Sequence, residues 1–167
     1  MKRTLAQLAA FGLLPLLTTG CGGGDGASRC GPSRATVTRV IDGDTVELED
    51  GTKVRYLLID TPEISGGAEC YGPEARDFNA ALVEGREVSL RYDVECTDHY
   101  GRLLAYVYVE STEVNMRMVE YGFACVLVIP PNGADRELEF KTAEAEAKAD
   151  QRGMWDPDVC QEVACDD

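Results

Sequence analysis

The sequence predicts a β-rich α+β protein in which helices pack on a small barrel of short strands. Five or six short segments have the apolar alternation or the β-branched and aromatic content of strands, and three others have helical composition. These strands and helices do not alternate along the chain, which argues against a doubly wound parallel sheet. We therefore expect a small barrel with helices packed on it.

The predicted strands follow a glycine-rich N-terminal region. Residues 35–50 alternate over two strands that are separated by a tight Asp-Gly turn at 42–43. A second Asp-Gly pair at 50–51 is a hairpin signal, so residues 53–59 are the returning strand, which a Thr-Pro pair ends. Further strands are predicted at residues 87–92, 103–109 and 123–129.

Three helices are predicted, each followed directly by a glycine, at residues 73–84, 115–121 and 134–152. The first has Pro73 at its start and acidic residues in its first turn. The last is rich in alanine and glutamate, which favour helix. Residues 157–167 are read as an acidic tail.

The first twenty residues have the organisation of an export signal. Lys2 and Arg3 form a basic start, residues 5–17 are mostly apolar, and small residues precede Cys21. The apolar run is too short for an ordinary membrane-spanning helix. We therefore expect a signal peptide at 1–20, a flexible tether at 21–34 and a folded domain at 35–156.

Cys21 has two interpretations. The stretch LTTGC resembles a bacterial lipoprotein cleavage site, at which the cysteine becomes the acylated N-terminus, although the usual leucine is displaced by one position. The alternative is ordinary signal-peptidase cleavage nearby and a free Cys21. We expect an exported protein that is lipid-anchored to the cell envelope through Cys21, or otherwise secreted.

The cysteine count supports export. If Cys21 carries lipid, six of the seven cysteines remain and can form three disulfides in an oxidising compartment. Their pairing is open: Cys160 and Cys165 can pin the tail to the body, and a Cys70–Cys96 bridge would brace the segments around Tyr71 and Asp98. A zinc site is disfavoured, because the sequence has no CxxC motif and a single histidine.

The net charge limits the modes of nucleic-acid binding. Thirty acidic and 16 basic residues give a formal charge of -14. A protein that only binds nucleic acid normally relies on a basic surface, so this class is disfavoured. An enzyme with a bound cation and a few arginines tolerates such acidity, because its site supplies local positive charge.

Candidate functional residues are concentrated in residues 41–63 and 98–102. The carboxylates Asp44, Asp60 and Glu63 can hold a hard divalent cation, and the guanidinium groups of Arg55 and Arg102 can bind phosphate oxygens. A cation, two arginines and a spare carboxylate are the groups that phosphodiester hydrolysis requires.

A calcium loop of the EF-hand kind beginning at Asp42 is excluded by spacing. The sixth position is Glu47 instead of glycine, and the twelfth is Lys53 instead of glutamate. Asp42 is therefore interpreted as a turn residue that accepts backbone hydrogen bonds. Asp44 lies at the start of a predicted strand. Aspartate is disfavoured in strands, so we expect its side chain to have a functional role.

Five motifs occur in order and at compatible spacing: VIDGDT, RYLLIDTPE, YGPEA, DHYGRLLAYVY and AEAKADQRGMW. Together they resemble the staphylococcal nuclease (thermonuclease) family over roughly residues 37–155. The resemblance implies an OB-like five-stranded barrel with three packed helices. It also implies calcium-dependent hydrolysis of DNA and RNA that leaves 3′-phosphate ends.

The resemblance also implies roles for individual residues. Asp44 and Asp60 match the Ca²⁺ carboxylate ligands, and the Thr61 backbone carbonyl matches a third ligand. Glu63 matches the general base that activates the attacking water, and Arg55 and Arg102 match the pair that binds the phosphate. His99 and Tyr100 match residues that contact phosphate in the family. At the position of His99 the family often has a lysine.

Two departures from the family affect its substrate contacts. The segment that carries base-stacking tyrosines in the family is Val126-Leu127-Val128-Ile129 here, and the acidity reverses the basic character of the founding member. We expect a monomeric nuclease. The alternatives are a noncatalytic OB-like module that binds nucleic acid and a surface protein that binds calcium without hydrolysis.

Overall fold

The computed structural model describes residues 28–163 and 165. The expected signal peptide, Cys21 and the first half of the expected tether (residues 21–27) therefore lie outside the described residues. The elements, in chain order, are β1 (Arg34–Val40), β2 (Thr45–Leu48), β3 (Lys53–Tyr56), β4 (Ile59–Asp60), α1 (Gly72–Val83), β5 (Glu87–Arg91), β6 (Leu103–Val109), β7 (Thr112–Glu113), α2 (Val114–Glu120), β8 (Cys125–Val126), α3 (Glu137–Ala149) and the 3₁₀ helix η1 (Gly153–Trp155).

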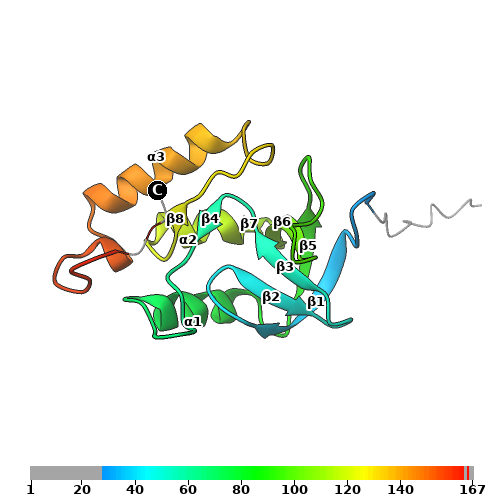
Figure 1. Cartoon of the computed structure of the whole chain (residues 1–167), viewed down its shortest axis with the longest axis horizontal. Helices are drawn as coiled ribbons and strands as arrows, with labels where there is room; N and C mark the ends of the chain where they lie inside the picture. The colour runs from blue at the N-terminus through cyan, green and yellow to red at the C-terminus, as the bar shows by residue number, and fades with distance from the viewer. Residues whose placement is uncertain (1–27, 164, 166–167) are drawn as a thin grey trace, which may run out of the picture.

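A closed five-stranded barrel forms the centre of the fold, as predicted (Figure 1). Its strands follow the order β3-β2-β1-β5-β6, and β3 closes the barrel by pairing with β6. The closing pair is parallel, with Val54 opposite Leu103, whereas the other neighbours are antiparallel. Closure leaves the two ends of the barrel as the places where loops gather.

The predicted strand 53–59 divides into two. β3 ends at Tyr56, Leu58 adopts a left-handed conformation with φ 65°, and the chain resumes as β4. β4 then pairs with β8, with Asp60 opposite Cys125. Asp60 therefore lies on a separate strand beside β8 and not at the end of the predicted returning strand of the hairpin. Of the predicted strand 123–129, only Cys125–Val126 is a strand.

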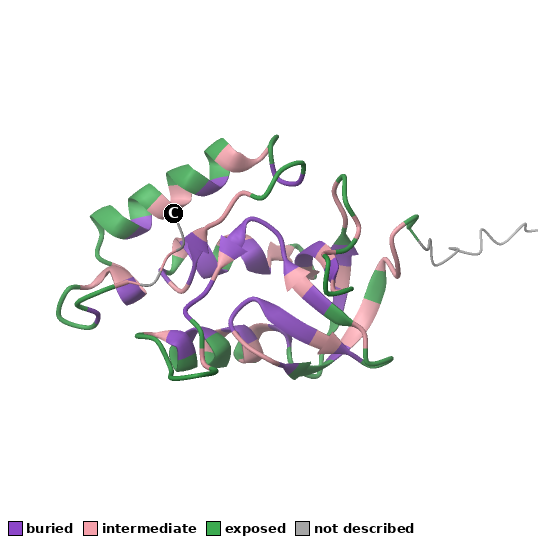
Figure 2. Ribbon diagram, in the orientation of Figure 1, coloured by how far each residue is buried: buried purple, intermediate pink, exposed green. Residues whose placement is uncertain are grey.

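Three helices cover the barrel, and their buried faces explain where each one packs. α1 contacts β1, and α2 lies between the barrel and α3. α3 is shorter than the predicted 134–152, because residues 134–136 form a turn ahead of it. Its buried residues are Phe140 and Ala147, and its other face is largely exposed (Figure 2).

A buried asparagine connects the barrel with the bend between β3 and β4. The Asn115 side chain accepts a hydrogen bond from the N–H of Val107 at 2.9 Å and donates one to the carbonyl of Leu57 at 2.9 Å. These bonds satisfy backbone groups that the strand pattern leaves unpaired. They hold the bend from which Ile59 and Asp60 project.

Three disulfides join the six described cysteines, as expected, but one proposed pairing is wrong. The bonds are Cys30–Cys96, Cys70–Cys160 and Cys125–Cys165, so the tail is pinned to the body at two points. Cys96 pairs with Cys30 rather than Cys70, because β1 runs antiparallel to β5 and brings the start of the chain beside the segment after β5. Within the described residues, no helix has the length and apolar character needed to cross a membrane.

Candidate active site

Asp44 occupies the centre of a small polar cluster at one end of the barrel. It lies directly before β2, and its side chain is only 7% exposed. One carboxylate oxygen accepts hydrogen bonds from the backbone N–H of Thr61 at 3.1 Å and its hydroxyl at 3.2 Å. The other accepts the Thr45 hydroxyl at 2.9 Å. Asp42 forms the predicted turn, accepting the N–H of Asp44 at 3.2 Å.

Arg55 joins the two acidic candidates. Its guanidinium contacts the Asp44 carboxylate, and its other terminal nitrogen lies 2.6 Å from Asp60 Oδ1. It also donates to the carbonyl of Ile59 at 2.9 Å. Arg55 therefore pairs with both carboxylates at once. The close packing of Gly43 against Thr61 brings the turn before β2 to the segment after β4, since a Cβ at Gly43 would lie 2.7 Å from Thr61 Oγ1.

Burial dominates the electrostatics of Asp44. Removal from water raises the pKa of its carboxyl from 3.8 to about 8, and the guanidinium of Arg55 opposes that rise. A buried carboxylate is costly unless a cation neutralises it. Asp44 and Asp60 therefore stand at a position that strongly favours positive charge.

The ligand atoms available here fit a hard cation. Carboxylate, carbonyl and hydroxyl oxygens from Asp44, Asp60 and Thr61 are the kinds of ligand that Ca²⁺ prefers. Among the described residues, no group of three or more His, Cys, Asp and Glu side chains is placed to hold a metal ion. A cation here would therefore take its remaining ligands from backbone oxygens and water, as Ca²⁺ often does.

Arg102 is held by the turn that precedes β6. Asp98 Oδ2 lies 2.6 Å from Arg102 Nε, and Asp98 Oδ1 accepts the backbone N–H groups of Tyr100 and Arg102, both at 2.9 Å. Burial tends to raise the pKa of Asp98, but the hydrogen bonds from Arg102 and Tyr100 outweigh it, so the pKa lies below its ordinary value. Asp98 thus stays ionised and fixes the guanidinium.

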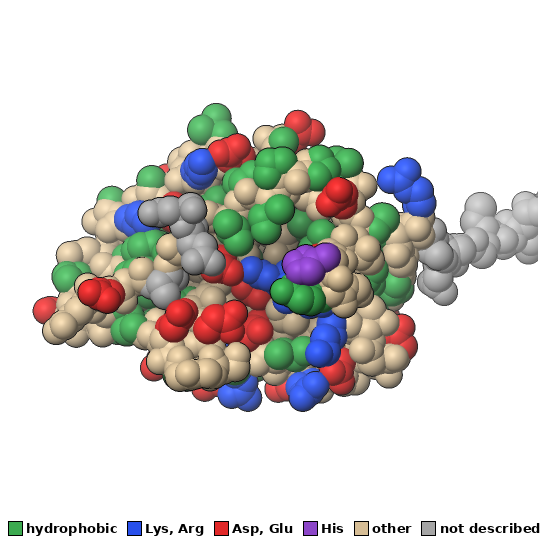
Figure 3. Space-filling model, in the orientation of Figure 1, with side chains coloured by type: hydrophobic (Ala, Val, Ile, Leu, Met, Phe, Trp, Pro, Cys, Tyr) green, Lys and Arg blue, Asp and Glu red, His purple; other side chains and the backbone are tan. Residues whose placement is uncertain are grey.

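One cavity of about 420 Å³ brings the two arginines together. Arg55 and Arg102 both line it, along with His99, while its other walls are mostly apolar. On this face of the molecule, basic side chains lie beside the histidine and acidic side chains gather next to them (Figure 3). The ring of the exposed Tyr100 packs against that of His99 in a tilted arrangement, with centroids 3.7 Å apart.

Glu63 stands apart from the other candidates. It is exposed on the loop between β4 and α1, and its backbone N–H donates to Glu69 Oε2 at 2.8 Å. It does not line the cavity. The structure therefore brings together Asp44, Arg55, Asp60 and Thr61, places Arg102 and His99 at the same cavity, and leaves Glu63 on a neighbouring loop.

Sequence reasoning missed two kinds of residue in this region. Thr45 hydrogen-bonds the buried Asp44, and Asn132 and Glu95 form part of the cavity wall. The sequence around Asn132, a proline-rich break, contains no pattern that predicts its role. The Asp98-x-x-x-Arg102 spacing inside a turn, in contrast, does indicate that this pair interacts.

Comparison with known proteins is consistent with this geometry. A family model described as Staphylococcal nuclease homologue matches residues 53–157, a range that contains Arg55, Asp60, Glu63 and Arg102 and begins after Asp44. The chain is 39% identical over 127 residues to Endonuclease YncB of Bacillus subtilis (strain 168), covering 72% of this chain and 60% of that protein.

Two further relatives cover different shares of their own length. Thermonuclease of Staphylococcus intermedius is 36% identical over 126 residues, covering 72% of this chain and 74% of that protein. SPbeta prophage-derived endonuclease YokF of Bacillus subtilis (strain 168) is 37% identical over 127 residues, covering 72% of this chain and 43% of that protein. The chain therefore spans 60% and 43% of the length of the two Bacillus relatives.

Proposed function

Because this chain belongs to the staphylococcal nuclease family, we propose that it is a calcium-dependent nuclease that hydrolyses phosphodiester bonds of DNA and RNA and leaves 3′-phosphate ends. The observation that carries the proposal is the convergence of Asp44 and Asp60 on Arg55, at a cavity that Arg102 also lines. Positive and negative groups with these chemistries are what a phosphodiester and a cation need at one place.

In this proposal, Asp44, Asp60 and the Thr61 carbonyl hold Ca²⁺, which supplies Lewis-acid polarisation of the phosphate when it is bound. Arg55 is already fixed by three contacts, so it can present its charge to a phosphate with little loss of conformational entropy.

Arg102 is proposed to bind the phosphate from the other side of the cavity. Asp98 engages Arg102 through Nε, and among the described residues no hydrogen bond uses the terminal nitrogens of Arg102. Those nitrogens are available to donate two parallel hydrogen bonds to phosphate oxygens, and these bonds strengthen as negative charge develops. His99, which lines the cavity, and the neighbouring Tyr100 are proposed as weaker phosphate contacts.

Glu63 is proposed to orient the attacking water and accept its proton. Its exposure suits this role, because an exposed carboxylate can take a proton from water and return it to solvent. A positioned base typically contributes about 10²- to 10⁴-fold to the rate.

The test is hydrolysis of single-stranded DNA by the purified chain, with calcium or with a chelator. We expect hydrolysis with calcium and none with chelator. Glu63→Gln should lower kcat by about 10²- to 10⁴-fold, whereas Glu74→Gln, at an exposed position in the first turn of α1, should not change it.

Two results would contradict the proposal: equal hydrolysis by the wild type and Glu63→Gln, or no hydrolysis with calcium present. Calcium binding without hydrolysis would favour a surface calcium-binding protein. DNA binding without calcium binding or hydrolysis would favour a noncatalytic module that binds nucleic acid.

We further propose that the protein is exported and anchored through acylated Cys21. The signal-like residues 1–20 support export, as do three disulfides, which persist in oxidising compartments. The mass of the mature N-terminus in the native host tests this: an unacylated Cys21 would rule out the anchor.

A further inference from the structure

The cavity beside Arg55 and Arg102 has mostly apolar walls, so its few polar side chains decide which ligand groups it accepts. The apolar lining comes from Leu57, Leu58, Ile59, Leu104, Leu127 and Ile129. Apolar walls suit the flat apolar faces of a nucleotide base whose phosphate lies at the two arginines. Among the polar side chains at the wall, Asp98 is engaged by Arg102 and Arg55 by two carboxylates.

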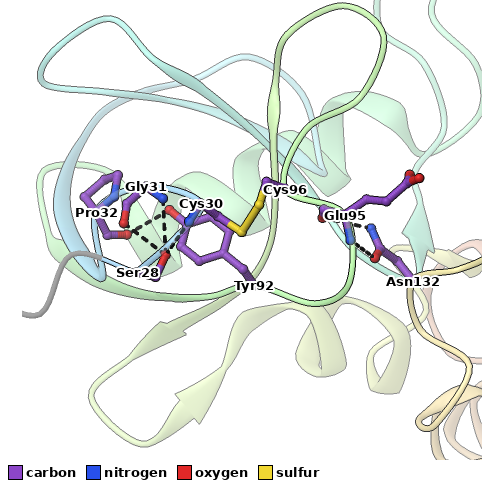
Figure 4. The surroundings of a disulfide bond; sticks show 8 residues. All are labelled: Ser28, Cys30, Gly31, Pro32, Tyr92, Glu95, Cys96 and Asn132. Atoms are coloured by element: carbon purple, nitrogen blue, oxygen red, sulfur yellow. Dashed lines mark hydrogen bonds between the residues drawn. A yellow bond between two sulfur atoms is a disulfide. The ribbon is translucent and has the colours of Figure 1, made fainter.

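Glu95 differs from these residues. It lines the same cavity, it is exposed, and among the described residues its carboxylate forms no hydrogen bond or ion pair. Figure 4 shows its side chain extending away from the Cys30–Cys96 disulfide and past the Asn132 amide. Of the two carboxylates in the cavity wall, Asp98 is paired with Arg102, and Glu95 is not used within the described part of the protein.

Hydrogen bonds hold both the N–H and the carbonyl group of Glu95, so the position from which its side chain extends is fixed. The Asn132 side chain accepts the Glu95 N–H at 2.8 Å and donates to the Glu95 carbonyl at 3.2 Å, and Asn132 is only 3% exposed. The next residue, Cys96, is bonded to Cys30 (Figure 4). Both ends of the Asn132 amide thus position Glu95.

An ionised carboxylate only accepts hydrogen bonds, so it distinguishes bases by their donors. Cytosine, adenine and guanine carry an exocyclic amino group with two N–H donors. Uracil and thymine have no amino group: the single donor of each base is the ring N3–H, which is flanked by two carbonyl oxygens that repel a carboxylate. A glutamate that accepts from the cytosine amino group is a known mode of base readout.

We infer that Glu95 is a specificity-determining residue that makes this site prefer nucleotides whose bases carry an exocyclic amino group over uracil and thymine. The inference rests on the proposed function, because it places a base in the cavity whose arginines bind the phosphate. It assigns selectivity to a residue outside the cluster of Asp44, Arg55 and Asp60.

The test compares two single-stranded substrates, oligo(dC) and oligo(dU), whose bases differ only at ring position 4, which is amino or carbonyl, and in the proton that uracil carries on N3. With the full chain and calcium at pH 8, kcat/KM should be about 10- to 100-fold higher on oligo(dC), the range expected for a hydrogen bond to a charged group. In Glu95→Ala the ratio should fall to about 1. Glu95→Gln should also lower it, because an amide can turn either its donor or its acceptor towards the base.

The matched control is Glu87→Gln, which removes the same charge at an exposed position of β5 that does not line the cavity. It should keep the wild-type ratio, so a general effect of net charge is separated from readout by Glu95. A wild-type ratio near 1, or the same ratio in Glu95→Ala as in the wild type, would overturn the inference.

A binding measurement separates failure of this inference from failure of the proposed function. If the wild type hydrolyses neither substrate, the proposed nuclease activity fails, and calorimetric titration with dCMP and dUMP then decides the role of Glu95. Tighter binding of dCMP that is lost in Glu95→Ala supports it, and equal affinities for the two nucleotides refute it.

Discussion

At the scale of single residues, the site depends on charged groups that are partnered before any substrate arrives. Arg55 contacts two carboxylates and a carbonyl, and Arg102 is held by Asp98. Prearranged groups of this kind lose little freedom on binding a phosphate. The same partners make the folded state sensitive to pH.

The Asp98–Arg102 pair provides a pH-dependent prediction. The pKa of Asp98 is lower in the folded protein than its ordinary value of 3.8, so the pair stabilises the fold above about pH 4. That contribution is lost as the pH falls through the folded pKa. Asp98→Asn should therefore lower the melting temperature at pH 7, and this difference should shrink as the pH falls below about 4.

Thermal unfolding of both proteins across this range measures the difference. Asp135→Asn, at an exposed position of the turn before α3, is the control and should leave the melting temperature unchanged throughout. A deficit in Asp98→Asn that is as large at pH 2.5 as at pH 7 would refute the assignment.

At the scale of secondary-structure elements, α1 sets the position of the loop that carries Glu63. Gly72, the first residue of α1, packs directly on that loop: a Cβ at Gly72 would lie 2.7 Å from the carbonyl oxygen of Glu63 and 2.9 Å from that of Pro62. The loop is also tied by the bond from the Glu69 N–H to the Glu63 carbonyl at 2.8 Å. The start of α1 therefore fixes the position of the loop that carries Glu63.

Gly72→Ala tests this coupling. Alanine favours helix over glycine by about 1 kcal/mol, so an effect through α1 alone would stabilise the protein. The close contact predicts instead that the Glu63 loop shifts. If Glu63 is the general base that we propose, kcat should fall at least tenfold, since small displacements of a catalytic group are costly.

The measurement is kcat with calcium, together with the calcium affinity, which should be retained because Asp44 and Asp60 are not touched by this change. Full activity in Gly72→Ala would show that the loop does not depend on its contact with α1.

At the scale of the whole molecule, three disulfides link the chain ends to the segments that carry the site. Cys30–Cys96 joins the start of the described chain to the segment before Asp98, and Cys125–Cys165 joins the tail to β8, which pairs with Asp60. The third, Cys70–Cys160, attaches the tail to the segment directly before α1. The disulfides thereby give a small acidic barrel covalent support around the candidate site.

Removal of these bonds should destabilise the protein strongly. The sequence separations are 66, 90 and 40 residues, and chain-entropy estimates for loops of that size are about 4 kcal/mol each. We expect a reductant to shift the urea unfolding midpoint to far lower concentration. Cys125→Ser/Cys165→Ser, which opens the shortest loop, should cost least among the three paired substitutions. An unchanged midpoint after complete reduction would contradict this view.

Much of the fold follows from local sequence. The Asp-Gly turns, the strand alternation and the glycine after each helix identify the barrel strands and the three helices with small errors at their ends. The division of residues 53–59 is different, because Leu57 and Leu58 show no turn signal. Their bend is selected by a tertiary contact, the hydrogen bond from Asn115 to the Leu57 carbonyl.

By itself, the sequence determined the chemistry of this protein: which carboxylates and arginines are present, where the turns that expose them lie, and which family it resembles. Only the tertiary structure decided how they meet. It placed Asp60 beside β8 instead of β2, joined Cys96 to Cys30, and exposed Glu95 in the cavity wall. These arrangements depend on contacts between residues far apart in the chain, so no local pattern records them.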